Sequence, residues 1–224
     1  KKEIDLKPIS KNFKEVLNNQ LKIVKYPSIW ILGLASSTMY VTRYAINSWG
    51  ILYLQEIRGF SLVEAGSIIG LNTFTGIIGC VAYGFISDKY FDARRPPVTL
   101  IFGIVEIASL FLIFFGPDST VVLTIAFLIY GFTLSGLLAV LGGLFAIDIA
   151  PKNISGAAMG FIGLFSYIGA GLQEKISSLL IKTSTENDTS ALLYNFDDAI
   201  IFWVFASIVS FILSLALWNK KTED

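Results

Sequence analysis

The sequence contains no histidine and a single cysteine, Cys80, among its 224 residues. Without histidine, the chain lacks both the commonest general acid–base catalyst and the commonest side-chain ligand of metal ions. One cysteine cannot form a disulfide within the chain, and because Cys80 lies in an apolar run we interpret it as a packing residue. A histidine-based catalytic triad is excluded, and we expect no metal ion, no cofactor and no enzymatic activity.

Charged residues are also scarce, at 15% of the chain, and 17 Lys and Arg balance 17 Asp and Glu. A net charge of zero gives no electrostatic reason to expect nucleic acid as a partner. Hydrophobic residues, in contrast, make up 54% of the chain, and the mean hydropathy is +0.68. This composition is unusual for a soluble domain and typical of proteins that cross the lipid bilayer several times.

Six segments are long and apolar enough to cross the bilayer, which takes about 20 residues of helix. They cover residues 28–54, 62–87, 98–115, 120–149, 155–181 and 199–218. A soluble helical bundle would need a polar face on each helix, and these segments carry very few polar residues. The sequence therefore predicts an all-α membrane protein with a six-helix transmembrane domain over residues 28–218.

Basic residues outside these spans are concentrated on one side of the predicted membrane domain. Residues 1–27 carry seven lysines, and more basic residues follow the second, fourth and sixth spans, whereas the opposite loops contribute Arg58 and Lys182. Because cytoplasmic loops carry the excess of Lys and Arg, we expect both termini in the cytoplasm. Residues 1–27 show neither an initiating Met nor a signal-peptide pattern, which predicts a central cytoplasmic linker of a longer protein. Residues 219–224 are expected to form a cytoplasmic tail.

Arg43 is the only charged residue in the first span. An arginine in mid-membrane costs about 2.5–3.5 kcal/mol on insertion scales, so it normally faces protein or a watery cavity. At helical spacing it shares a face with Ser36, Tyr40 and Asn47. It could pair with an acid on another helix, for which Glu106 in the third span is a weak candidate. Alternatively it binds an anion, since its planar fork fits a phosphate or carboxylate.

The fifth span carries a stripe of small residues at steps of three and four: Gly156, Gly160, Gly163 and Gly171. Small residues in such a stripe let helices approach closely. Tyr167 and Glu174 lie on the same face, and Lys175 follows Glu174 in sequence. The two charges either neutralise each other or contact the substrate; the sequence leaves both possibilities open.

A charged cluster follows the second span in the stretch GFISDKYFDARR. It contains Gly84, Asp88, Lys89, Arg94 and Arg95. In one interpretation, the basic residues serve only to set the orientation of the protein in the membrane. Alternatively, the cluster is a latch that holds helices together in one conformation and releases them in another.

Three stretches resemble the organophosphate:phosphate antiporters, a branch of the major facilitator superfamily that includes bacterial glycerol-3-phosphate and hexose-phosphate carriers. They are YVTRYAINSWGILYLQE, GFISDKYFDARR and APKNISGAAMGFIGLFSYIGA. Compared with the general superfamily pattern, the second stretch has residues inserted before its basic pair and lacks the internal glycine. With the six-span layout, the resemblance covers nearly the whole chain and implies the C-terminal half of a twelve-helix fold.

The resemblance implies that Arg43 grips the substrate phosphate together with an arginine of the absent N-terminal six-helix half. It further implies that Tyr40, Tyr130 and Tyr167 line the same cavity, and that Glu174 and Lys175 lie near a charge pair that affects substrate choice. The implied activity is exchange of an organophosphate for inorganic phosphate by alternating access, in a bacterial inner membrane. The same family includes a membrane sensor of hexose phosphate that signals to a histidine kinase, and these residues do not discriminate the two. A carrier of another substrate, such as a phosphoglycerate, also stays open.

Overall fold

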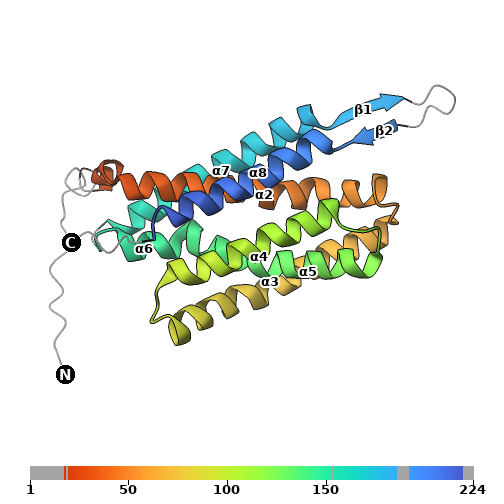
Figure 1. The fold of residues 1–224 in the computed structure, drawn as a ribbon. Helices are drawn as coiled ribbons and strands as arrows, with labels where there is room; N and C mark the ends of the chain where they lie inside the picture. The colour runs from red at the N-terminus through yellow and green to blue at the C-terminus, as the bar shows by residue number, and fades with distance from the viewer. Residues whose placement is uncertain (1–17, 19, 153, 186–191, 219–224) are drawn as a thin grey trace.

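The structure, a computed structural model, describes residues 18, 20–152, 154–185 and 192–218. Long helices dominate it and run roughly side by side (Figure 1). Their bounds are α2 Pro27–Glu56, α3 Leu62–Tyr90, α4 Arg95–Phe115, α5 Thr120–Ala139, α7 Ser155–Leu180 and α8 Asp197–Leu215. A 3-10 helix, η1 (Lys22–Lys25), precedes α2, and α5 continues through one π-helical turn, η2 (Val140–Leu144), into α6 (Phe145–Ile149). A helical segment covers each of the six predicted spans, with ends that differ by at most three residues. The predicted linker and tail lie mostly outside the described residues.

Five of the six long segments are apolar and long enough to cross a membrane, with Thr120–Ile149 counted as one. The exception is α2, whose 30 residues include Arg43, Asn47 and several serines, threonines and tyrosines. Its position explains how it tolerates them, because α2 packs against α7 and α8 and also contacts α3. Neighbouring helices thus cover much of α2, and the hydroxyls of Ser36 and Thr42 bond to α7 and α8.

The helices form two groups of three. One consists of α2, α7 and α8, and the other of α3, α4 and α5; they meet where α4 packs on α8 and α2 on α3 (Figure 1). Aromatic rings fill the junction, with Trp203 of α8 next to Phe114 of α4, and Tyr53 of α2 next to both Phe114 and Phe196. This junction fixes α2 relative to both groups.

Glycine allows α3 and α5 to approach closely. A Cβ added to Gly79 of α3 would lie 1.8 Å from the Phe132 carbonyl oxygen, and one added to Gly131 of α5 would lie 2.1 Å from the Asn72 carbonyl oxygen. Neither site has room for a methyl group, so the two backbones are in direct contact along this line.

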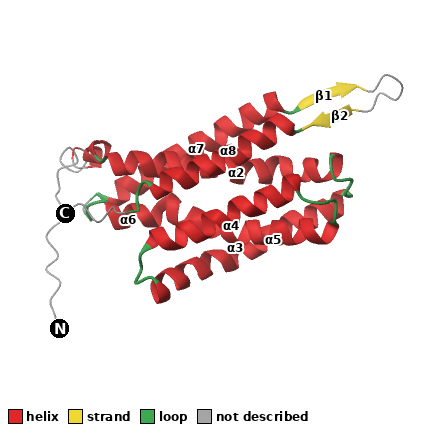
Figure 2. Cartoon of the chain, viewed as in Figure 1, coloured by secondary structure: helices red, strands yellow, loops and turns green. Residues whose placement is uncertain are grey.

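A two-stranded antiparallel sheet extends beyond the helices at one end of the molecule (Figure 2). It pairs β1 (Lys182–Thr185) with β2 (Leu192–Asn195), in a register that sets Lys182 opposite Asn195. Lys182 Nζ donates to Asp198 Oδ2 at 2.6 Å, and this hydrogen bond raises the pKa of Lys182. The polar composition of this segment predicted only a loop, so the ribbon is an addition to the expected architecture.

The turn between α3 and α4 carries backbone strain. Asp92 and Ala93 have φ values of 50° and 61°, and the Ala93 N–H donates to the Ser87 carbonyl at 2.9 Å, closing the end of α3. A side chain in this left-handed region costs roughly 1–2 kcal/mol, which glycine avoids.

Replacing Ala93 by glycine is therefore expected to raise the free energy of unfolding by about 0.5–1 kcal/mol. Thermal unfolding in detergent would measure the change. Ala82→Gly in the helical part of α3 is the matched control and should lower stability by a similar amount, because glycine is a poor helix former. Equal effects of both substitutions would contradict the strain at Ala93.

Candidate functional site

Arg43 lies near the middle of α2, and its guanidinium is held by aromatic rings. The guanidinium carbon lies 5.4 Å from the centre of the Tyr40 ring and 5.7 Å from that of Tyr44. In the described residues, no Asp or Glu oxygen lies within 4.0 Å of its nitrogens. Rings supply only a weak electrostatic partner, of about 0.5–2 kcal/mol, and leave the donors of the guanidinium free to bind an anion.

Glu106, the acid weighed as a partner for Arg43, lies elsewhere in the bundle. It is fully buried on α4, and its Oε2 accepts a hydrogen bond from the Ser207 hydroxyl of α8. The ion pair with Arg43 is therefore not formed in this structure.

Tyr40, the neighbour of Arg43, contacts tyrosines of two helices. The Tyr40 ring stacks near Tyr44 with centroids 6.0 Å apart and meets the Tyr167 ring of α7 edge-on at 5.9 Å. Tyr167 is 65% exposed, so this face of the bundle is open. The Tyr40 hydroxyl reaches the π-helical turn η2, where a Cβ added to Gly142 would lie 3.9 Å from it. The predicted residues Tyr40 and Tyr167 thus contact each other, Tyr40 also contacts Arg43, and η2 borders Tyr40.

Tyr130 occupies a different position from the other predicted tyrosines. It is fully buried on α5, and its hydroxyl donates to the Thr42 carbonyl of α2 at 3.3 Å. It therefore lies behind Arg43 rather than on the open face.

A second polar group lies farther along α2. Asn47 is exposed one helical turn beyond Arg43, and the next residue, Ser48, donates its hydroxyl to the Glu174 carboxylate of α7. Five residues of helix separate Arg43 from Ser48, a rise of about 7.5 Å. Lys175 is exposed beside Glu174, and no ion pair between them is present in the described part of the chain. The interpretation of Glu174 and Lys175 as a mutually neutralised pair is thus not supported.

Sequence reasoning missed Tyr44 and Ser48. Tyr44 is adjacent to Arg43 in the sequence, and helical spacing places it on another face, although an arginine side chain is long enough to reach a neighbouring ring. The four-residue step from Tyr40 to Tyr44 was the available signal. Ser48 had none, because its partner Glu174 lies 126 residues away in the sequence.

The charged cluster after α3 is assembled in part. Arg95 Nε donates to Asp148 Oδ2 of α6 at 3.0 Å, and Arg95 Nη1 lies 3.4 Å from Asp88 Oδ1. Lys89 instead lies over the Phe85 ring, 5.0 Å from its centre. Arg95 thus ties together the end of α3, the start of α4 and α6, and Asp148 is a member that the sequence did not indicate.

Arg94 and Gly84 contribute less to this cluster. In the described part, Arg94 forms no ion pair, and its backbone N-caps α4. A Cβ added to Gly84 would meet nothing within 4 Å. The ion pairs of this cluster in the described residues therefore depend on Arg95.

Much of the glycine stripe of α7 faces empty space. Added Cβ atoms would meet nothing within 4 Å at Gly156, Gly160, Gly163 and Gly171. Gly169, on another face, packs on α2, where a Cβ would lie 2.3 Å from the Ser37 carbonyl oxygen. Within the described part of the chain, these four glycines thus have no packing partner, and they lie next to the face that bears Arg43 and Tyr167.

Comparison with known proteins identifies the family of this chain. Residues 2–173 match the Major Facilitator Superfamily. The chain belongs to this superfamily. The Membrane sensor protein UhpC of Escherichia coli (strain K12) is 36% identical over 165 residues, which cover 71% of this chain and 36% of that protein. The Glycerol-3-phosphate transporter of Bacillus subtilis (strain 168) is 29% identical over 231 residues, which cover 99% of this chain and 46% of that protein.

A third superfamily member, the Probable hexose phosphate transport protein of Chlamydia pneumoniae, is 30% identical over 165 residues, or 70% of this chain and 33% of that protein. The chain thus spans between a third and a half of the length of these relatives. The resemblance to the organophosphate:phosphate antiporter branch is confirmed, as is the fold of one half of a major facilitator protein.

Proposed function

We propose that the protein exchanges an organophosphate, either a sugar phosphate or glycerol-3-phosphate, for inorganic phosphate by alternating access. The observation that carries this proposal is Arg43, a permanent cation in the middle of α2 with aromatic neighbours and no carboxylate partner among the described residues. A phosphate supplies the missing counter-charge, and the guanidinium fork can bind two of its oxygens at once.

This chain is proposed to be the C-terminal half, with the site completed by an N-terminal six-helix half. One arginine neutralises a dianionic phosphate poorly, so a second cation is expected across the cavity. The open glycine stripe of α7 supports a partner there, because small residues allow close helix contact. A binding site near the midplane between two rocking halves is the arrangement that alternating access needs.

Exchange follows if phosphate favours the transition between the inward-open and outward-open states. A ligand can shift such an equilibrium only through its different affinity for the two states. When the phosphate draws both halves together, the loaded carrier switches faster than the empty one. The Arg95 cluster, with Asp88 and Asp148, is proposed as the cytoplasmic latch that stabilises one of these states.

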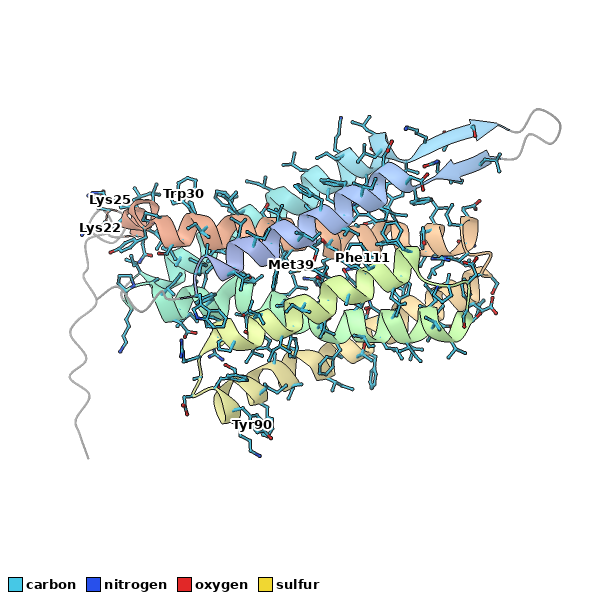
Figure 3. The ribbon with its side chains drawn as sticks, in the orientation of Figure 1. Lys22, Lys25, Trp30, Met39, Tyr90 and Phe111 are labelled. Atoms are coloured by element: carbon cyan, nitrogen blue, oxygen red, sulfur yellow. The ribbon has the colours of Figure 1, made fainter. Side chains whose placement is uncertain are left out.

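Both termini are proposed to lie in the cytoplasm of a bacterium, with the protein in the inner membrane. Figure 3 supports this orientation, because Lys22 and Lys25 lie at the same end of the bundle as Tyr90 and the basic α3–α4 turn. An excess of Lys and Arg marks the cytoplasmic side.

The decisive experiment uses the full-length protein in liposomes loaded with inorganic phosphate and offered labelled organophosphates. Uptake that requires internal phosphate is the expected result. Uptake that is independent of internal phosphate would refute the exchange mechanism. The alternative is a sensor, which the relatives named Membrane sensor protein favour; saturable binding without uptake would support it.

The group of Asn47, Ser48, Glu174 and Lys175 is proposed to contact the organic part of the substrate. It lies about 7.5 Å along α2 from Arg43, far enough to reach hydroxyl groups beyond the phosphate. Glu174→Gln keeps the size of the side chain and removes its charge.

In the liposome assay, Glu174→Gln is expected to raise the half-saturation for organophosphates at least tenfold, since a hydrogen bond to a charged group contributes roughly 1.5–3 kcal/mol. The half-saturation for inorganic phosphate should stay the same. Glu56→Gln, an exposed carboxylate at the end of α2, is the control and should alter neither. An equal change for both substrates would place Glu174 outside the proposed subsite.

A further inference from the structure

Thr42, the residue before Arg43, is fully buried and bonded to another helix. Its hydroxyl donates to the Trp203 carbonyl of α8 at 3.1 Å. Hydroxyls of helical threonines commonly bond to carbonyls of their own helix, and Thr38, one turn earlier, does so with Leu34 and Ala35. Thr42 therefore links α2 to α8 rather than adding to the bonds within α2.

The backbone of Thr42 is held from a second helix as well. Its carbonyl accepts the hydroxyl of Tyr130 on α5 at 3.3 Å, and both side chains are fully buried. One residue of α2 is thus bonded to α8 through its side chain and to α5 through its backbone.

Consecutive residues of a helix point about 100° apart. Fixing Thr42 between α5 and α8 therefore fixes the direction in which Arg43 leaves the helix. Within the described part of the chain, the guanidinium contacts Tyr40 and Tyr44, and both residues belong to α2. These contacts would turn with α2 and cannot hold it in place.

We propose that Thr42 and Tyr130 are positioning residues that set the rotation of α2 and thereby aim Arg43 at the open face. Tyr130 acts through Thr42 and does not contact the phosphate. The inference rests on the proposed function for its consequence in transport, but the position of residue 43 can be measured without any substrate.

The first test measures that position directly in the full-length protein. Arg43→Cys is introduced with Cys80→Ser, because Cys80 is exposed, and with every other cysteine replaced by serine. The rate at which a charged methanethiosulfonate reagent modifies Cys at position 43 is then compared in three backgrounds: Thr42→Val, Tyr130→Phe and Thr38→Val. Thr42→Val and Tyr130→Phe are expected to change the rate about fivefold, and Thr38→Val should leave it unchanged, because its bonds lie within α2.

Unchanged rates in both Thr42→Val and Tyr130→Phe would overturn the proposal. A position 43 that the reagent cannot reach even without these substitutions would also overturn it, because Arg43 would then not face water.

The second test uses exchange in liposomes with Arg43 intact. Thr42→Val and Tyr130→Phe should each raise the half-saturation for inorganic phosphate about fivefold, and Thr42→Ser should restore it because the hydroxyl returns. A role in direct contact predicts otherwise: Tyr130→Phe alone would weaken phosphate binding, and Thr42→Val would not. Accessibility changes without any phosphate effect would uphold the positioning and contradict the phosphate function, so the two failures are distinguishable.

Discussion

Replacing Arg43 by lysine is expected to lower the rate of exchange about 100-fold although the positive charge is kept. Lysine offers a compact ammonium group that cannot bind two phosphate oxygens in the planar fork of a guanidinium. It also loses the flat surface that rests against Tyr40 and Tyr44. A 100-fold loss corresponds to about 2.7 kcal/mol, within the range of charge-assisted hydrogen bonds. Initial rates of labelled phosphate exchange in liposomes would measure it.

Folding provides the control for Arg43→Lys. Because Arg43 has no ion pair among the described residues, the variant should unfold in detergent at nearly the temperature of the parent protein. A normal exchange rate in Arg43→Lys would remove the guanidinium from the site. A large loss of stability would instead indicate that Arg43 is structural, with a partner outside the described residues.

Replacing Gly79 by alanine is expected to have the largest effect on folding. The added Cβ would lie 1.8 Å from the Phe132 carbonyl oxygen, and an obstructing backbone atom cannot move aside as a flexible side chain can. The α3–α5 contact must open, at a cost of about 3 kcal/mol or more. Thermal unfolding and the yield of monodisperse protein in detergent would report this loss.

Gly66→Ala is the matched control on the same helix. A Cβ at Gly66 meets nothing within 4 Å, and alanine favours helix by about 1 kcal/mol over glycine. This variant should be at least as stable as the parent protein. Unfolding of Gly79→Ala at the same temperature as Gly66→Ala would contradict the direct backbone contact between α3 and α5.

The sequence predicted the spans well because their signal is local. A run of about 20 apolar residues has few other uses, so all six segments were located within three residues. The β-ribbon was missed because the stretch TSTENDTS, which begins within β1, is polar and rich in turn-forming residues. The π-helical turn η2 was also missed. It depends on backbone hydrogen bonds that a Gly-Gly pair permits, but such a pair does not by itself predict a π-helical turn.

The site was predicted only where its residues share one helix. Tyr40 and Arg43 are three residues apart, and helical geometry alone brings them together. The bond between Ser48 and Glu174 joins α2 to α7, and that between Tyr130 and Thr42 joins α5 to α2. Such pairs depend on the rotation of each packed helix, which is decided by tertiary contacts such as the glycine approach at Gly169.

The polar character of α2 has a consequence for biosynthesis. Arg43 and the many hydroxyl groups make α2 costly to insert alone into lipid. The helices that cover its polar groups in the folded protein are mainly α7 and α8. Those two helices begin 99 and 141 residues after the end of α2, and so leave the ribosome well after it. The segment must therefore wait at the membrane insertion machinery until α7 and α8 follow, and a chain truncated after α5 leaves it without these two neighbours.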